Sequence, residues 1–571
     1  MRTELARPYG LAVSELVHTQ RLQVVATTVF LFALAVVFGS GTGILVLGGQ
    51  PFATIFFAAV LLPLLFWRVP ASPVILLVVA ATSIERFGEN FQDAITSRIP
   101  LFRSLQESYG ISGAVVDPIE VIMALALLIW VAKAVNDRRL TLRSSPLGVA
   151  VAVVLVIALL EELYGLARGG IFNISLWELR PFVYLAVAYL LASQLITSTT
   201  ALDAILGGIV IGTGLKGVLG TERVITLANV VPPPEAILEH EESFFFSIFI
   251  LLTVAMWVLG RRGKLRLIAT GLLPFVVVAD LGNDRRTAWI ILPAILLALW
   301  VILYQRMPAR RKVLGIVAAV VVVLGSGYVA ALKDSSSLLG HPANAIWSQF
   351  SPNTRDSSSD LYRMFENQNL AIDIRESFMT GTGFGVPINH PIPVFDASSM
   401  DPLINFIPHN TILYVWLRTG ALGAVAFWFM VGAAIIAACR LARHRDANFC
   451  LFGAFSLAVI IAWLIQGRLD KGITSFRVAI LVGCIMGALQ AARRLAPAAL
   501  SAHSPAADAV AQVETAEEIR AQLVPFPAGY LRVPRIRKRA SLYGRGPSHH
   551  DGIRTASAPS TSSSSGSSDA S

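Results

Sequence analysis

Charged residues are scarce in this chain. Only 14% of its 571 residues are Asp, Glu, Lys or Arg, whereas about a quarter of a typical soluble domain is charged. Cysteine is scarce as well: Cys439, Cys450 and Cys484 are the only three, and none lies in a long hydrophilic loop. The first shortage argues against an ordinary water-soluble domain, and the second argues against a disulfide framework or a cysteine-based metal site.

Long apolar runs take the place of the missing charge. Hydrophobic residues make up 55% of the sequence, the mean hydropathy is +0.66, and runs such as 22–38, 244–259 and 313–332 show no polar alternation. Segments of about 17–25 such residues cross a bilayer only as helices, because lipid offers no partners for backbone polar groups. We therefore predict an all-α fold, a polytopic transmembrane bundle of about 12–14 spans. The predicted spans are residues 22–39, 51–67, 70–84, 118–135, 147–163, 181–197, 202–219, 243–260, 266–281, 287–304, 313–332, 411–437, 449–466 and 474–490.

Basic residues are concentrated in short loops between these spans. The loops at 137–143, 261–266, 306–312, 440–445 and 493–494 are all basic, and the predicted topology puts all of them on one side of the membrane. The positive-inside rule identifies that side as the cytoplasm. Both termini fall on the same side, so we predict a multi-pass protein of a bacterial cytoplasmic membrane with both ends inside.

The composition divides the chain into three regions. Residues 1–21 are mostly polar, and the apolar run after them lacks a small-residue cleavage pattern, so we expect a cytoplasmic N-terminal segment rather than a cleaved signal peptide. Residues 22–496 form the multi-pass domain. Residues 497–571 are rich in Ala, Pro and Ser, which is typical of a disordered cytoplasmic tail. Its basic run at 535–539 suits anionic lipid headgroups better than nucleic acid.

The outer face carries the most informative residues. The loop at 333–410 is far longer than a connection needs to be, which is typical of a functional loop, and its residues 359–378 predict an amphipathic helix. The positive-inside rule disfavours arginine on this face. The topology nevertheless predicts five cations on the outer face: Arg180, Arg286, Arg363, Arg468 and Lys471. Each of them can pair with a nearby carboxylate or a lipid headgroup, but as a set they indicate an anion site, and the planar fork of arginine suits phosphate.

His409 lies where this loop enters the span that begins at Thr411. Asn410 is a favourable N-cap residue, and the partial positive charge of a helix N-terminus favours the neutral imidazole that a general base requires. The plainer alternative is a histidine that only hydrogen-bonds at the interface. The aspartates of the outer loops lack a metal-binding spacing, so we predict no metal site.

Three segments in order resemble the O-antigen ligase and polysaccharide polymerase family. The first is Asp284-Arg285-Arg286-Thr287-Ala288-Trp289, similar to that family's Ser-Arg-x-x-Trp turn. The second runs from Arg363 to the turn at 381–385, and the third comprises the His409-Asn410 pair with Thr419-Gly420-Ala421-Leu422-Gly423. Two departures stand out. Arg285 replaces the usual Ser, and Arg418 stands where an acidic residue is frequent, which makes it a candidate for altered acceptor preference.

The resemblance implies an activity and roles for these residues. Members transfer a glycan from an undecaprenyl-pyrophosphate carrier to an acceptor hydroxyl on the outer side of the cytoplasmic membrane. We expect no cofactor, since the lipid-linked sugar donor is a substrate. His409 matches the family's essential histidine, Arg286 and Arg363 match its pyrophosphate arginines, and Gly420 and Gly423 match its glycine motif. Arg180, Arg468 and Lys471 are added here from topology alone. The expected partners are the lipid-linked glycan, a glycan or glycolipid acceptor, the bilayer and envelope-polysaccharide assembly proteins, but no nucleic acid.

Three alternatives stay open at this point. A polymerase would use the same fold and donor but extend another lipid-linked repeat, and no feature of the sequence separates it from a ligase. A transporter or flippase of lipid-linked sugars would place charges inside the spans. Lys216, within the span at 202–219, favours the transporter, whereas the motif charges at outer helix ends favour chemistry on one face. A receptor or scaffold that only binds sugar is the third.

Overall fold

The computed structural model describes residues 61–86, 95–138, 142–230, 236–335, 337–395 and 403–502. All of them belong to one compact unit, Met1–Ser504. The N-terminal segment expected at 1–21, the span expected at 22–39, part of the span expected at 51–67 and the tail from residue 503 onward lie outside the described residues.

The described part of the chain contains helices and no strands. Its numbered helices are α3 (Ser72–Ser83), η1 (Ile95–Arg98), α4 (Leu105–Tyr109), α5 (Pro118–Asn136), α6 (Pro146–Ala167), α7 (Phe172–Leu195), α8 (Thr199–Thr226), α9 (Glu242–Val258), α10 (Lys264–Asn283), α11 (Ala288–Arg306), η2 (Pro308–Arg310), α12 (Arg311–Leu332), α13 (His341–Trp347), α14 (Thr354–Glu376), α15 (Thr411–Ala442), α16 (Ala447–Leu469) and α17 (Phe476–Ala502).

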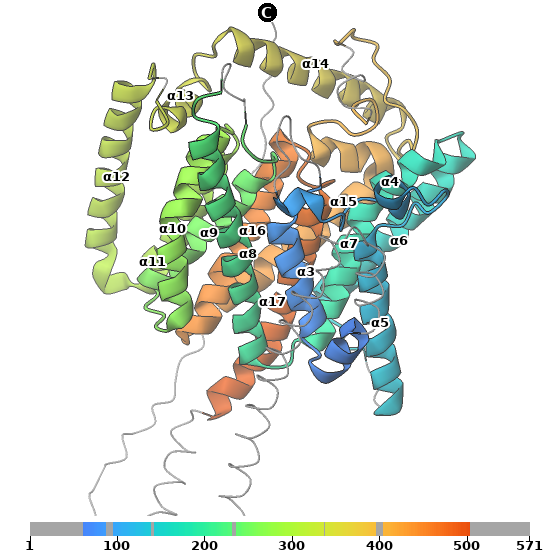
Figure 1. Cartoon of the computed structure of the whole chain (residues 1–571), viewed down its shortest axis with the longest axis horizontal. Coiled ribbons are helices and arrows are strands. Elements are labelled where there is room, and N and C mark those ends of the chain that lie inside the picture. Colours follow the sequence, from blue (N-terminus) through green and yellow to red (C-terminus); the bar gives the residue numbers. More distant parts are fainter. Residues whose placement is uncertain are drawn as a thin grey trace, which may run out of the picture. The chain divides into compact units, whose positions relative to one another are not determined.

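Ten of the described helices are long and apolar enough to cross a membrane. They are α5, α6, α7, α8, α10, α11, α12, α15, α16 and α17. Two shorter apolar helices, α3 and α9, match the spans predicted at 70–84 and 243–260. The fold is therefore the predicted polytopic helical bundle. Figure 1 shows these helices side by side, with α13 and α14 of the long loop lying across one end.

Polar residues set the points where several spans begin. Ser145 accepts a hydrogen bond from the amide of Gly148 at the start of α6, and Asp446 accepts one from the amide of Asn448 at the start of α16. These side chains satisfy amide groups that have no partner within the helix. Pro118 and Pro146 each occupy the first position of a helix, where proline costs no hydrogen bond.

Small residues allow the closest helix contacts. α17 packs along α7 so tightly that a Cβ atom on Gly483 would lie 2.4 Å from the carbonyl oxygen of Leu185. The approach of backbones at small residues is how helices associate in lipid, where no hydrophobic effect drives them together. In contrast, α12 has no buried residue. The indole of Trp300 in α11 donates a hydrogen bond to the carbonyl of Leu314 in α12 at 3.3 Å.

Two of the spans differ from their predictions in ways that bear on the predicted site residues. α7 begins at Phe172 rather than at 181, so Arg180 lies inside the helix instead of at its outer start. Glu178 and Arg180 both lie within this helix, buried and ion-paired. α15 is interrupted at Gly420, which adopts φ 59° and ψ −169°. The amide of Ala421 next to this break donates to the carbonyl of Phe378 at 2.9 Å.

Candidate functional site

The helix α14 brings the long loop between α12 and α15 onto the end of the bundle (Figure 1). It covers 354–376, close to the helix predicted at 359–378. Asn353 caps it by accepting a hydrogen bond from the amide of Asp356 at 2.8 Å. Residues three or four apart share one face of a helix. Asp360, Arg363 and Asn367 accordingly line the same cavity.

This cavity has a volume of about 500 Å³ and lies between three parts of the chain. Arg286 comes from the turn before α11, Arg363 comes from α14, and Arg468 comes from the end of α16. Three of the five outer cations singled out from the sequence therefore line one space, although they lie far apart in the chain. The amide side chains of Asn367 and Gln368 face the same cavity, and such groups can bind sugar hydroxyls.

The two central arginines differ in their partners. Arg286 pairs with Asp360, with 3.1 Å from Nη2 to Oδ1 and 3.3 Å from Nη1 to Oδ2, and it lies 3.7 Å from a carboxylate oxygen of Asp356. In Arg363, the buried Nε has no hydrogen-bond partner among the described residues. Because that nitrogen is closed off from solvent, an anion in the cavity would contact the rest of the Arg363 guanidinium together with Arg286 and Arg468.

His409 is held beside the cavity by α14. Its Nδ1 lies 3.1 Å from Oε1 of Glu366, and its backbone amide donates to Oε2 of the same carboxylate at 3.1 Å. The ring of Tyr362 meets the imidazole edge to face at a centroid distance of 5.8 Å. Asn410 caps α15 through the amide of Leu413 and donates its own amide to Asn367 at 2.7 Å.

The turn between α16 and α17 supports His409 from the other side. The amide of Lys471 donates to the carbonyl of His409 at 2.9 Å, and the hydroxyl of Thr411 donates to the Gly467 carbonyl at the same distance. Asp470 lies 3.1 Å from Nδ1 of His240. Burial alone would raise the pKa of the Asp470 carboxyl, but the neighbouring side chains of His240, Arg363 and His409 hold it well below its usual range.

The remaining predicted site residues lie elsewhere or have mainly backbone roles. Arg180 is buried against α5, with its Nε 2.9 Å from Glu120 and its Nη1 3.9 Å from Asp117, and it does not line this cavity. Gly420 takes a left-handed φ because the chain from Met379 passes against it, leaving no room for a Cβ atom. Gly423 packs against the side chain of Thr419.

Arg418, suggested by the sequence as a determinant of acceptor preference, is fully buried. It pairs with Glu178 at 2.7 Å and donates hydrogen bonds to carbonyl groups of Gly383, Val386 and Phe406. Arg418 thus fastens the glycine-rich turn at 381–385 to α15 and α7, which makes it a structural residue. Neither Glu366 nor Glu178 was identified from the sequence as a partner of a site residue. Only Glu366 could have been found, because it follows Arg363 by three positions on a predicted helix and so lies near it.

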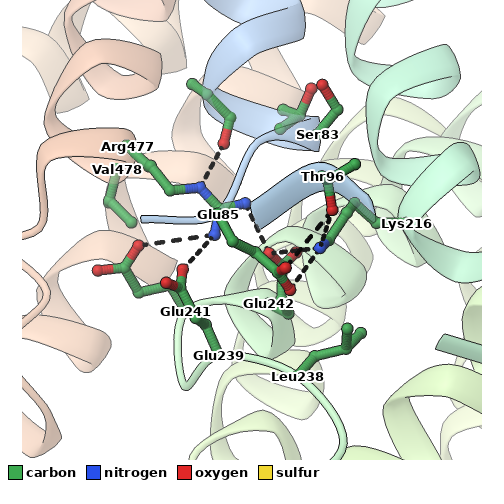
Figure 2. Close-up of polar contacts among 12 residues, drawn as sticks. Ser83, Glu85, Thr96, Lys216, Leu238, Glu239, Glu241, Glu242, Arg477 and Val478 are labelled. Carbon is green, nitrogen blue, oxygen red and sulfur yellow. Dashed lines mark hydrogen bonds and ion pairs between the residues drawn. The ribbon is translucent and has the colours of Figure 1, made fainter. Parts of the chain in front are cut away.

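A second group of charges is buried among α3, α8, α9 and α17 (Figure 2). Lys216 lies 2.5 Å from Glu85 and 3.6 Å from Glu242, and Arg477 lies 2.7 Å from Glu242 and 2.9 Å from Glu239. We call Glu85, Lys216, Glu239, Glu241, Glu242 and Arg477 the buried cluster. Lys216 therefore has nearby counter-charges, which weakens its value as a sign of a transport route. Among the described residues, no group of three or more His, Cys, Asp and Glu side chains is arranged to hold a metal ion.

Comparison with known families agrees with this arrangement. Residues 277–428 match the family model described as O-antigen ligase. That range includes Arg286, Arg363 and His409, while Arg180, Arg468 and Lys471 fall outside it. No curated protein matches the chain significantly. The chain is a multi-pass helical membrane protein, and its residues 277–428 form a domain that resembles the O-antigen ligase type of membrane glycosyltransferase.

Proposed function

We propose that this protein transfers a glycan from an undecaprenyl-pyrophosphate carrier to an acceptor hydroxyl on the outer face of a bacterial cytoplasmic membrane. The observation that carries the proposal is the meeting of Arg286, Arg363 and Arg468 in one cavity, next to a histidine held by the same helix. Guanidinium groups bind phosphate oxygens through paired hydrogen bonds. Three arginines against one lining carboxylate, Asp360, support an anionic ligand in particular.

The proposed reaction is a single displacement. The acceptor oxygen forms a bond to the anomeric carbon of the donor sugar while the bond from that carbon to the pyrophosphate oxygen breaks. His409 accepts the proton of the acceptor hydroxyl, and Arg286 and Arg363 stabilise the charge that develops on the departing undecaprenyl pyrophosphate. One displacement inverts the anomeric centre.

Fixed cations at the leaving group can take over the role that a metal ion has in many glycosyltransferases. We therefore expect metal-independent transfer. Treatment of the purified protein with EDTA should leave the rate unchanged, and loss of activity that a divalent ion restores would contradict this part of the mechanism.

A polymerase remains the nearer alternative, because the same cavity and the same base would serve when the acceptor is another lipid-linked repeat. The size of the product separates the two reactions, since ligation adds one glycan and polymerisation gives a ladder. The transporter alternative has less support once Lys216 is paired with Glu85 and Glu242.

The deciding experiment is glycan transfer by purified protein in lipid, with undecaprenyl-pyrophosphate oligosaccharide and candidate acceptors. We compare the wild type with His409→Ala and Arg286→Ala, and use Arg310→Ala, an exposed arginine of η2, as a matched control. We expect transfer by the wild type and the control only. Full activity of His409→Ala would remove the proposed base, and donor movement across the bilayer without transfer would favour the transporter.

A further inference from the structure

Glu366 is a buried carboxylate whose two oxygens both contact His409. It is 2% exposed. Its Oε1 lies 3.1 Å from Nδ1 of His409, and its Oε2 accepts the backbone amide of His409 at the same distance. The two contacts fix the ring and the backbone of the histidine together.

The contact with Nδ1 has a chemical consequence. A carboxylate only accepts hydrogen bonds, so Nδ1 must carry the proton in the contact between them. The neutral imidazole then has its lone pair on Nε2, which is the nitrogen that can accept a proton. The His409 side chain is 24% exposed, whereas the Glu366 side chain is 3% exposed, so the ring is accessible while its partner is not.

The position of Glu366 on α14 links this contact to the cavity. Arg363 and Asn367 line the cavity, and Glu366, three residues after Arg363 on the same side of α14, contacts His409. Any placement of α14 that aims Arg363 into the cavity therefore also sets the orientation of the imidazole.

We propose that Glu366 is a positioning residue for His409, which holds it in the tautomer with a free Nε2 and stabilises the imidazolium that forms during transfer. This inference rests on the proposed function. The proton moves from the acceptor hydroxyl to Nε2 and then leaves to solvent after the products depart, and Glu366 itself stays ionised throughout. Such a carboxylate orients a catalytic imidazole without taking up its proton.

The alternative role is purely structural, since Glu366 also satisfies an amide just before α15. Asp373 offers a matched control for that role. It lies on the same helix, is 3% exposed, and accepts hydrogen bonds from the amide and the side chain of Asn389 at 2.9 and 3.2 Å, without touching His409. A substitution there removes a buried carboxylate of α14 and leaves the histidine alone.

The test compares Glu366→Gln, Glu366→Asp and Asp373→Asn by the pH profile of transfer and by thermal unfolding. Glutamine keeps an acceptor oxygen for His409 but carries no charge, so it cannot stabilise the imidazolium that forms during transfer. We expect Glu366→Gln to lower kcat by about 10- to 1,000-fold, to move the acid limb of the profile to lower pH, and to change the donor KM by less than about threefold. Glu366→Asp should keep the wild-type position of the acid limb, and Asp373→Asn should keep both rate and profile.

A double variant decides between the two roles. If Glu366 acts through His409, adding Glu366→Gln to His409→Ala should cause no further loss of rate. An equal extra loss in that background, or an unshifted profile in Glu366→Gln, would overturn the positioning role. The proposed function fails separately: wild-type turnover by His409→Ala would remove the base itself, whereas an inactive His409→Ala with an unaffected Glu366→Gln would remove the role of Glu366 alone.

Discussion

The buried cluster and the cavity both gather cations at the same end of the bundle, but their charges are balanced differently. In the buried cluster, Lys216 and Arg477 are almost completely buried and face four glutamates. In the cavity, three arginines share the lining with a single carboxylate, Asp360, whose side chain is 48% exposed.

This difference separates structural cations from ligand-binding ones. A buried cation is stable only with counter-charges in contact, so Lys216 and Arg477 hold α3, α8, α9 and α17 together and have no capacity for a ligand. The cavity has an excess of positive charge and access to solvent, so it gains free energy from an added anion. An arginine at the end of a span is therefore informative only together with its burial and its partners.

The largest expected effect comes from breaking the buried cluster. Arg477→Met would leave Glu239 and Glu242 buried without their closest counter-charge, which should lower the free energy of unfolding by about 3–5 kcal/mol. Thermal unfolding of the purified protein measures this. Arg468→Gln, a cavity arginine that is exposed, should change it by less than about 0.5 kcal/mol. Equal unfolding temperatures of Arg477→Met and the wild type would show that the buried cluster does not stabilise the fold.

Arg363→Gln tests whether a cavity arginine binds ligand rather than stabilising the fold, so we expect a large effect on transfer and a small one on stability. Removing a cation that faces the developing charge should lower the rate by about 10²–10³-fold. The unfolding temperature should stay close to that of the wild type, since the Nε of Arg363 has no described partner to lose. Arg363→Lys keeps the charge but lacks the fork, and should recover part of the rate. A rate loss that only follows a loss of folded protein would contradict the assignment.

The sequence predicted most of the membrane-spanning helices but not which charged residues pair with one another. Uninterrupted apolar runs identify helices such as α12 and α16 because lipid forces them to satisfy their own backbone. The start of α7 was missed because Glu178 and Arg180 look like loop residues until their counter-charges are known. Glu178 pairs with Arg418, 240 positions away, and no local pattern predicts such a contact.

The same limit applies to the site. The motifs placed His409, Arg286 and Arg363 on the outer face, but hydropathy could not tell Arg468, which reaches the cavity, from Arg180, which is neutralised by Glu120. The break at Gly420 was also hidden, because the left-handed φ there depends on the packing of Met379 against it.

A smaller effect should follow from Asp360→Asn, and its sign is unusual. The carboxylate of Asp360 occupies both ends of the Arg286 fork, as a phosphate group would. Donor binding must compete with this exposed pair, which is worth no more than about 1 kcal/mol. We expect Asp360→Asn to lower the donor KM by about two- to fivefold. Asp203→Asn, which breaks an exposed pair with Arg261 outside the cavity, should leave KM unchanged. A higher KM in Asp360→Asn would mean that Asp360 positions Arg286 instead.

The smallest effect concerns Asp470, which contacts His240 and is influenced by Arg363 and His409. Its folded-state pKa lies below the value of about 3.9 in an unfolded chain, so the folded protein binds fewer protons at this residue. Its contribution to stability is then complete above about pH 5 and is lost as the pH falls through the folded pKa.

Asp470→Asn should therefore lower the unfolding temperature at pH 7, and the gap to the wild type should narrow as the pH is lowered toward 3.5. Thermal unfolding across this range measures the gap, with Asp373→Asn as the buried-carboxylate control on α14. A constant gap would mean that Asp470 contributes through packing alone. A narrowing gap would show that the ionised Asp470 carboxylate is stabilised by its charged neighbours, His240 first and Arg363 and His409 after it.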